Sequence, residues 1–188
     1  MTAVQTSPSV AGYIPGTWTI DPSHSEVGFS IRHLMVSKVK GRFSEFSGTL
    51  VTGENPLDSS VEASIVLSSI DTGNADRDAH VRSADFLDVE QHTVMTYRST
   101  GVRAEGDGYV LDGELSLRDV TRPLALHLEV NGFQGATPFG DTRAGFTATT
   151  EIDRADFGIS FNAPLEGGGV VLGSKITITL EIEAVLQG

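Results

Sequence analysis

Residues 175–186 read KITITLEIEAVL, and apolar side chains occupy every second position of this stretch. From Ile176 to Ala184 the residues between them are threonines and glutamates. A period of two is typical of a β-strand that buries one face and exposes the other to water. The stretch therefore predicts a long strand over residues 173–186, with Ile176, Ile178, Leu180, Ile182 and Ala184 on its buried face.

The same alternation recurs along the chain in EVGFSIRHL (26–34), VEASIVL (61–67), YVLDGELSL (109–117) and PLALHLEV (123–130). Segments rich in Gly, Asn, Asp and Pro separate these runs and are typical of turns. Strands without intervening helical periods indicate an antiparallel all-β protein. Besides 173–186, we expect strands near residues 17–21, 25–35, 39–52, 60–70, 93–103, 108–119, 123–133 and 142–154.

Each predicted strand has one apolar face, and closing the sheet would bury all these faces together and remove its edges. We therefore predict an antiparallel eight-stranded β-barrel. No change of composition divides the chain, so residues 16–188 are expected to form a single domain. Residues 1–15 are polar and unpatterned and are expected to form a flexible N-terminal arm.

The stretch NADRDAHVRSADFLD, residues 74–88, lacks the β alternation. Asn74 or Asp76 can cap the start of a helix, and the segment has little β-branched character. We expect a short helical insertion near 74–88 that lies over one mouth of the barrel. Phe86 and Leu87 would be its apolar anchors.

Composition and charge exclude several kinds of function. The chain contains no cysteine, which excludes disulfides, thiolate zinc sites and cysteine nucleophiles. Its net charge of −12 argues against binding nucleic acid and against docking on anionic lipid through a polybasic patch. No apolar run reaches the length of a membrane span, and the N-terminus does not resemble a secretory signal, so we expect no integral membrane segment and a cytoplasmic location.

Four ordered blocks of sequence carry a resemblance to a known family. They are GTWTIDPSHSEVGFSIRHLMVSKVKGRFSEFSGTL (16–50), SIDTGNADRDAHVRSADFLDVEQH (69–92), LDGELSLRDVTRPL (111–124) and EIDRADFGI (151–159). Together they resemble the YceI-like family of lipocalin-like polyisoprenoid-binding proteins, over residues 17 to about 186. The chain departs from the family pattern at Leu87 and Tyr97, where the family usually has Phe.

The resemblance implies a lipocalin-like barrel enclosing a long apolar cavity for one polyprenyl chain, such as a polyprenyl phosphate or the tail of an isoprenoid quinone. It also implies a homodimer and a role in carriage, storage or stress protection. Each isoprene unit offers about 4 kcal/mol of burial as an upper limit, at roughly 0.8 kcal/mol per CH₂. Beyond such a bound lipid or quinone, we expect no cofactor.

We expect the cavity to be lined by apolar side chains from several strands and from the helical insertion: Val27, Phe29, Ile31, Phe43, Ile65, Phe86, Leu87 and Phe157. Small residues on the inner face would leave room for a ligand. The inward candidates of modest size also include Val61, Ala63, Val94, Ala125, Ala144 and Ala148.

Five polar residues are candidates for holding the head group: His33, Arg77, Asp78, His80 and Arg154. Each has a simpler structural interpretation. His33 could bond the backbone, Asp78 could stabilise a helix start while Arg77 pairs with a carboxylate, and an ion pair of Arg154 with Asp153 or Asp156 is the favoured role of that arginine. Because the net charge disfavours a pyrophosphate unless a base is aimed at it, a quinone-like head is preferred.

Catalysis has little support in the sequence. It shows no nucleophile elbow, phosphate loop or nucleotide fingerprint, and its histidines lack metal-ligand spacing. We therefore predict no catalytic residue, no metal site and no enzymatic activity. The alternatives are an enzyme that uses Asp78 and His80 as an acid–base pair on a hydrophobic substrate, and a quinone-holding accessory of electron transfer.

Overall fold

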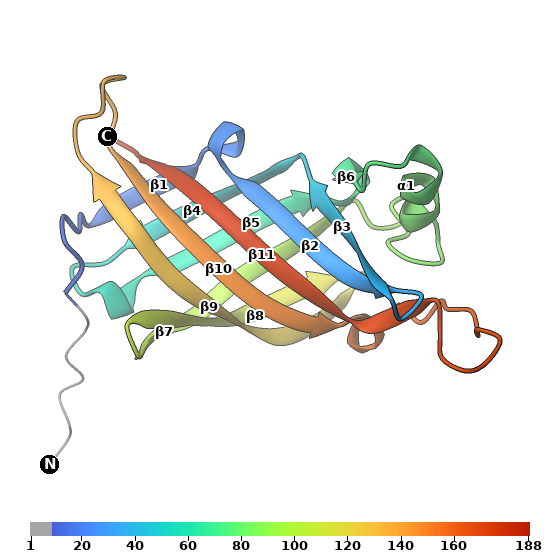
Figure 1. Ribbon diagram of the computed structural model, residues 1–188. Coiled ribbons are helices and arrows are strands. Elements are labelled where there is room, and N and C mark those ends of the chain that lie inside the picture. The colour runs from blue at the N-terminus through green and yellow to red at the C-terminus, as the bar shows by residue number, and fades with distance from the viewer. Residues whose placement is uncertain (1–8) are drawn as a thin grey trace, which may run out of the picture.

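The computed structural model describes residues 9–188, and its strands form one continuous antiparallel sheet (Figure 1). The strands are β1 (Gly16–Ile20), β2 (Glu26–His33), β3 (Ser37–Phe43), β4 (Phe46–Thr52), β5 (Ser60–Val66), β6 (Ile70–Asp71), β7 (Val94–Glu105), β8 (Gly108–Leu117), β9 (Val120–Gln134), β10 (Arg143–Asp153) and β11 (Leu172–Leu186). The helices are α1 (Ala75–Arg82) and the 3₁₀ turns η1 (Pro22–His24), η2 (Pro56–Asp58), η3 (Leu67–Ser69) and η4 (Arg154–Phe157).

Eight strands close the barrel in the order β1-β4-β5-β7-β8-β9-β10-β11, because β11 pairs back onto β1. The C-terminal end of β11 pairs with β1, with Trp18 opposite Leu186, while its N-terminal half pairs with β2, with Ile176 opposite Ile31. Toward the α1 end, the barrel wall beside β11 is therefore formed by β2 and β3. At the other end, β1 and β4 occupy these positions. The predicted all-β, antiparallel eight-stranded barrel with one short helix is confirmed.

Two predicted strands are interrupted. The segment 39–52 is divided between β3 and β4 by a bend at Ser44 and Glu45, where the Ser44 N–H donates to the Ser69 carbonyl (3.2 Å). The segment 60–70 ends as a strand at Val66 and continues as the η3 turn, whose Leu67 is completely buried. Both breaks occur where the chain turns a corner at the α1 end of the barrel.

The predicted helical insertion near 74–88 contains the helix α1, which covers eight residues and is followed by turns. Asn74 is its N-cap, and the Asn74 Oδ1 accepts a bond from the Arg77 N–H (2.9 Å). The helix ends at Arg82, where the Ser83 N–H bonds the His80 carbonyl. Figure 1 places α1 at the end of the barrel opposite the C-terminus.

Of the predicted N-terminal arm, residues 1–8 lie outside the described residues. Closer to β1 the chain is attached to the barrel. The Tyr13 hydroxyl donates to the Gly53 carbonyl (2.8 Å), and its ring packs edge-on against Phe133 at a centroid distance of 5.2 Å. In the described part of the chain, no helix has the length and apolar character needed to cross a membrane.

Candidate functional site

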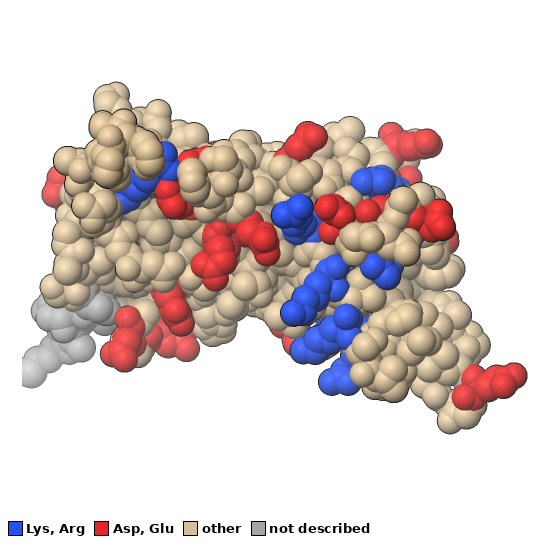
Figure 2. Space-filling model, turned by 45° about the horizontal axis from the view of Figure 1, so that its top comes forward, with Lys and Arg blue, Asp and Glu red and all other residues tan. Residues whose placement is uncertain are grey.

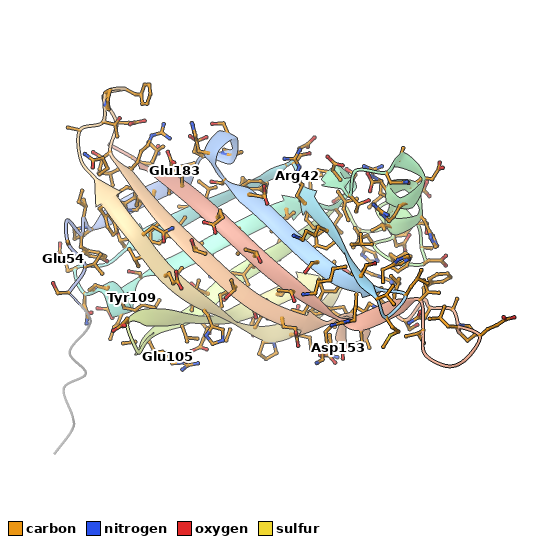
Figure 3. The ribbon with its side chains drawn as sticks, in the orientation of Figure 1. Arg42, Glu54, Glu105, Tyr109, Asp153 and Glu183 are labelled. Atoms are coloured by element: carbon orange, nitrogen blue, oxygen red, sulfur yellow. The ribbon has the colours of Figure 1, made fainter. Side chains whose placement is uncertain are left out.

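A continuous cavity of about 470 Å³ runs along the inside of the barrel. Val10 and Tyr13 line it at the end near the chain termini, and Arg77 and Phe86 line it at the α1 end. Tyr109, labelled in Figure 3 away from α1, is also part of the wall. Nearly all the lining side chains are apolar, and ligand cavities of small-molecule binding proteins have volumes of about 300–1,000 Å³. The barrel therefore holds a compartment of ligand size.

Seven of the eight predicted cavity residues line this compartment: Val27, Phe29, Ile31, Phe43, Ile65, Phe86 and Leu87. Phe157 does not. It is buried to 3% exposure in the main core cluster, at the η4 turn. The turn packs its ring into the core beside the described wall.

The predicted small inward residues divide into two groups. Val61, Ala63 and Ala148 line the cavity, whereas Val94, Ala125 and Ala144 are not part of its wall. Val94 is 42% exposed, and Ala144 belongs to a separate core cluster around Trp18. On β9 the inward residues are the leucines that flank Ala125, since Leu124, Leu126 and Leu128 all line the cavity.

The list of predicted cavity residues missed much of the wall, which comes from the long strands β8, β9 and β11. The missed residues are Leu111, Leu115, Leu117, Leu124, Leu126, Leu128, Ile176, Ile178, Leu180 and Ile182. Alternation in the sequence identifies each of these apolar faces. It does not distinguish a face that fills a core from one that surrounds a space.

The charged and imidazole side chains of the wall are all basic. They are His33, Arg77, His80 and Arg154, and no Asp or Glu belongs to the described lining. His33 lies at the end of β2, Arg77 and His80 lie on α1, and Arg154 starts the η4 turn that follows β10. All four thus belong to the α1 end, and the structure gathers four of the five predicted head-group candidates there.

Arg154 is buried to 5% exposure, and its guanidinium donates only to backbone carbonyls. Nε bonds Gly173 O (2.9 Å), and Nη1 bonds Ile159 O (3.1 Å) and Phe161 O (2.7 Å). Burial lowers the pKa of Arg154, while the nearby charge of Asp153 opposes that shift. The favoured ion pair with Asp153 or Asp156 is absent among residues 9–188, because the guanidinium points away from both carboxylates to tie η4 to β11.

Arg77 and Asp78 both bond Thr72, at the end of β6. The Asp78 carboxylate accepts from the Thr72 N–H (2.9 Å) and hydroxyl (2.5 Å). Arg77 donates through Nε to the Thr72 hydroxyl (2.8 Å) and through Nη2 to the Thr72 carbonyl (2.9 Å). Asp78 is buried and is not part of the described cavity lining, and its carboxylate holds α1 to the end of β6.

His80 takes part in an aromatic cluster at the mouth. Its ring packs edge-on against Phe86 and Phe161 at centroid distances of 5.0 and 4.9 Å, and Phe86 and Phe161 are 5.3 Å apart. His80 Nε2 lies 2.8 Å from Asp85 Oδ2. Asp78 and His80 thus bond different partners, Thr72 and Asp85 respectively.

Tyr97 places a hydroxyl in the wall between the two ends. It donates toward the carbonyls of Leu111 and Leu124, each at 3.1 Å. Burial, and secondarily the charge of Asp112, raises the pKa of Tyr97, so the phenol stays neutral. Because its proton is already engaged by the barrel backbone, Tyr97 adds little polarity to the cavity.

A second ionic cluster lies at the opposite end of the molecule. Ligand-type atoms of Asp21, His24 and Glu183 lie within 4.8 Å of one another. Arg143 Nη1 donates to both Asp21 Oδ2 (2.8 Å) and Glu183 Oε1. The guanidinium therefore occupies the position between these carboxylates, and the cluster is an ionic network rather than an open set of metal ligands.

A closed antiparallel barrel of eight strands around a ligand-sized apolar space defines the chain as a small β-barrel of the lipocalin-like, ligand-enclosing class. The family model of the YceI-like domain matches residues 18–184. The chain therefore belongs to the YceI-like family, as the sequence motifs predicted.

Similar proteins agree with this assignment. A UPF0312 protein of Pectobacterium atrosepticum is 39% identical over 163 residues, covering 85% of this chain and 84% of that protein. Protein YceI of Salmonella newport is 42% identical over 138 residues, covering 73% of this chain and 72% of that protein.

Solved structures share the fold. BcnA of Burkholderia cenocepacia superposes with a TM-score of 0.75 at 18% identity, covering 87% of this chain and 98% of that chain. A YceI protein of Campylobacter jejuni gives 0.71 at 25% identity, with coverages of 89% and 96%. A polyisoprenoid binding domain of Saccharophagus degradans gives 0.68 at 15% identity, with coverages of 93% and 100%.

Proposed function

We propose that the protein binds one isoprenoid lipid non-covalently, with the polyprenyl tail inside the barrel and the head group at the α1 end. The observation that carries this proposal is the asymmetry of the cavity. Its wall is apolar along the barrel, and its charged and imidazole side chains are basic and gather at one mouth. A fold relative is named as a polyisoprenoid binding domain, which supports the same ligand class.

The same asymmetry bears on the chemistry of the head. Arg77 and Arg154 have no carboxylate within 4.0 Å in the described chain. Guanidinium groups favour phosphate because they offer several donors and a fixed positive charge. The net charge of the molecule favoured a quinone, but the bases at the mouth meet the condition set for an anionic head. We therefore propose a polyprenyl phosphate as the preferred ligand, ahead of a quinone.

The proposal describes a carrier or store of lipid and assigns no turnover. A homodimer and a cytoplasmic location are the accompanying predictions from the sequence. Sedimentation velocity measures the first, and cell fractionation measures the second.

The direct test is to recover and titrate the ligand. Mass spectrometry of lipids extracted from the purified protein should show a polyprenyl compound. Trp18, the only tryptophan, packs at 5.5 Å from Phe133, which lines the cavity. Its fluorescence should therefore be quenched as an isoprenoid quinone is added. A protein that neither carries nor takes up any polyprenyl compound would overturn the proposal.

The head group is tested by competition. A polyprenyl phosphate should displace the quinone, and an Arg77→Gln variant should weaken the phosphate more than the quinone, by about tenfold for one charged hydrogen bond lost. An Arg98→Gln variant is a control, because Arg98 is an exposed residue of β7 that pairs with Glu62 away from the cavity wall. Equal losses for both ligands would contradict the phosphate assignment.

A further inference from the structure

The α1 end of the barrel exposes large apolar side chains. The tip of the β2–β3 hairpin presents Leu34 (40% exposed), Met35 (52%) and Val36 (82%). Phe161 and Val170, in the segment that precedes β11, are each 38% exposed. The two segments are neighbours, since the Leu34 N–H donates to the Val171 carbonyl (2.8 Å). We call these five residues the apolar tip.

The residues of the hairpin turn are unfavourable for its backbone conformation. Leu34 and Met35 have φ angles of 51° and 63°, and the Val36 N–H bonds back to the His33 carbonyl at 3.2 Å. This is the geometry of a type I′ turn, for which Asn-Gly is the favoured sequence. Two large apolar residues in left-handed backbone at an exposed tip are costly for folding. The preferences of this turn therefore do not account for Leu34 and Met35.

A basic surface adjoins the apolar tip. All three lysines of the chain belong to it, and its members are Arg32, Lys38, Lys40, Arg42 and Lys175. Strand register places Arg32 opposite Lys38 on adjacent strands, and these side chains point outward because their alternate neighbours line the cavity. Figure 2 shows blue side chains gathered in a run beside a protruding lobe that is tan except for an acidic side chain, in red, at its tip. We call these five residues the basic flank.

Most of this charge is not neutralised within the molecule. Arg42 lies 3.7 Å from Asp71, and Lys175 lies 3.7 Å from Asp153. Arg32, Lys38 and Lys40 have no carboxylate within 4.0 Å anywhere in residues 9–188. In a molecule with a net charge of −12, this local excess of positive charge is a distinct surface.

Protection of a sheet edge does not account for the whole surface. On the side away from β2, β3 pairs only through Arg42 and Phe43, with β6. Lysines on such an edge discourage pairing with another chain. That explains Lys38 and Lys40, but Arg32 lies on the interior strand β2, and an edge under protection would be capped by a polar turn rather than by Leu-Met-Val.

We propose that this end of the protein docks on the surface of an anionic lipid bilayer. The apolar tip enters the headgroup region and the basic flank contacts the lipid phosphates, the combination that holds interfacial proteins on membranes. The net charge of −12 argues against docking on anionic lipid for the molecule as a whole, but the basic flank carries a local positive charge. Docking needs no ligand in the cavity, although it would set the mouth with Arg77 and His80 near the bilayer, where the proposed lipid could be exchanged.

Vesicle co-sedimentation tests the docking with isoprenoid-free lipids. The protein should sediment with phosphatidylcholine vesicles that contain phosphatidylglycerol, much less with phosphatidylcholine alone, and less as salt is raised. Neutralising Lys38 and Lys40 together, as K38Q/K40Q, should lower the partition coefficient by about fivefold for each lysine. An R32Q variant should lose a similar factor while leaving the β3 edge unchanged.

The apolar tip has a variant that protects folding. Leu34→Asn with Met35→Gly installs the sequence that a type I′ turn prefers, so thermal stability should be kept or raised while vesicle binding falls by about tenfold or more. Phe139→Ser is the matched control, because Phe139 is 85% exposed in the loop between β9 and β10, at the other end of the barrel. It should bind vesicles as the wild type does.

Two outcomes would overturn the docking. One is an absence of binding to anionic vesicles. The other is binding that the tip variant leaves unchanged and that polyglutamate-coated beads reproduce, which would show an acidic protein partner instead of lipid. The result is separate from the proposed function: a protein that binds these vesicles but takes up no isoprenoid would overturn the lipid cavity alone.

Discussion

Arg143 joins three segments at the end of the barrel where the C-terminus lies. Its guanidinium bonds Asp21, which follows β1, Asp141 in the loop before β10, and Glu183 in β11. The hydrogen bond from Arg143 is the main cause that lowers the pKa of Asp141, and the hydrogen bond from Thr137 is the second. The pKa of Asp21 is also lowered, by hydrogen bonds from Ser23, His24 and Arg143 in that order. Figure 3 shows Glu183 at this end and Arg42 toward α1.

These pKa shifts fix the direction of the pH dependence. A carboxyl group with a lowered pKa in the folded state stabilises the fold above its unfolded pKa, which is near 3.8. That stabilisation is lost as the pH falls through the folded-state value. Arg143→Gln should therefore lower the free energy of unfolding at neutral pH, and the difference from the wild type should shrink as the pH falls below about 4. Urea unfolding at a series of pH values measures it.

Arg103→Gln is the control for this prediction. Arg103 also bonds two carboxylates, of Asp112 and Glu105, but on the exposed outer face of β7 and β8. Exposed ion pairs contribute little to stability. A variant at Arg103 that cost as much as the one at Arg143 would contradict the special role of the cluster.

Single residues also show where sequence patterns stop being informative. The run DRADF offers Arg154 two nearby aspartates, yet its acceptors include Gly173, which is distant in sequence. Alternation places Tyr97 on an inner face but does not predict which carbonyls its hydroxyl bonds. The ring needs Gly113 on β8, because a Cβ there would lie 2.4 Å from the Tyr97 oxygen. Such contacts depend on register between strands.

At the scale of elements, α1 is fastened to the barrel by polar bonds more than by an apolar face. Asp78 accepts two bonds from Thr72, and Arg82 donates to the carbonyls of Ser68 (2.9 Å) and Ile70 (2.8 Å). The helix spans only eight residues, and helices this short are marginal in isolation. Its position over the mouth therefore depends on these bonds to the segment 68–72.

Removing one fastening should loosen the helix. Asp78→Ala leaves the Thr72 N–H without its acceptor, which should cost about 1–3 kcal/mol of unfolding free energy. Hydrogen exchange should accelerate in residues 72–92 before it accelerates in the barrel strands. Asp76→Ala, at an exposed position two residues earlier, is the matched control and should cost less than about 1 kcal/mol. Equal exchange in both variants would show that Asp78 does not hold α1.

Strand prediction succeeded where alternation is long and failed at corners. The stretch that forms β11 was predicted within one residue, because five apolar positions alternate there without a break. The break between β3 and β4 was missed although Phe43 and Phe46 are three residues apart, an odd spacing that a continuous strand would place on opposite faces. Both rings line the cavity because the chain turns a corner between them, where the Ser44 N–H bonds the Ser69 carbonyl.

For the whole molecule, the strand patterns predicted the closed barrel, whereas the cavity at its centre was expected from the family resemblance. Every strand supplies one apolar face, and closure is the arrangement that buries them all. Whether the centre is filled depends on strand tilt and on how far opposite walls stand apart. The wall is built mainly from leucine, isoleucine, valine and phenylalanine, although small residues were expected to create the space.

The charge of the whole molecule likewise differs in sign from the charge of the cavity wall. A net charge of −12 describes solubility and long-range repulsion. The described wall of the cavity nevertheless carries His33, Arg77, His80 and Arg154 without any carboxylate. Binding at the mouth responds to the local field, so inferences from total charge apply to the surface as a whole and not to this site.

The length of the cavity should set the length of the ligand, and Ala63 offers a way to shorten it. Ala63 lies on β5 between Gly48 and Tyr97, lines the cavity and is only half-buried. Ala63→Phe would place a ring across the space. We expect binding of a long polyprenyl ligand to weaken by at least about tenfold more than that of a short one, because each excluded isoprene unit forfeits up to about 4 kcal/mol of burial.

Ala125→Phe, the same change at a β9 position outside the cavity wall, should leave the chain-length preference unchanged. Titration of both variants with a short and a long isoprenoid quinone measures the difference, and an equal loss for the two ligands would mean that the tail does not run along the barrel past Ala63.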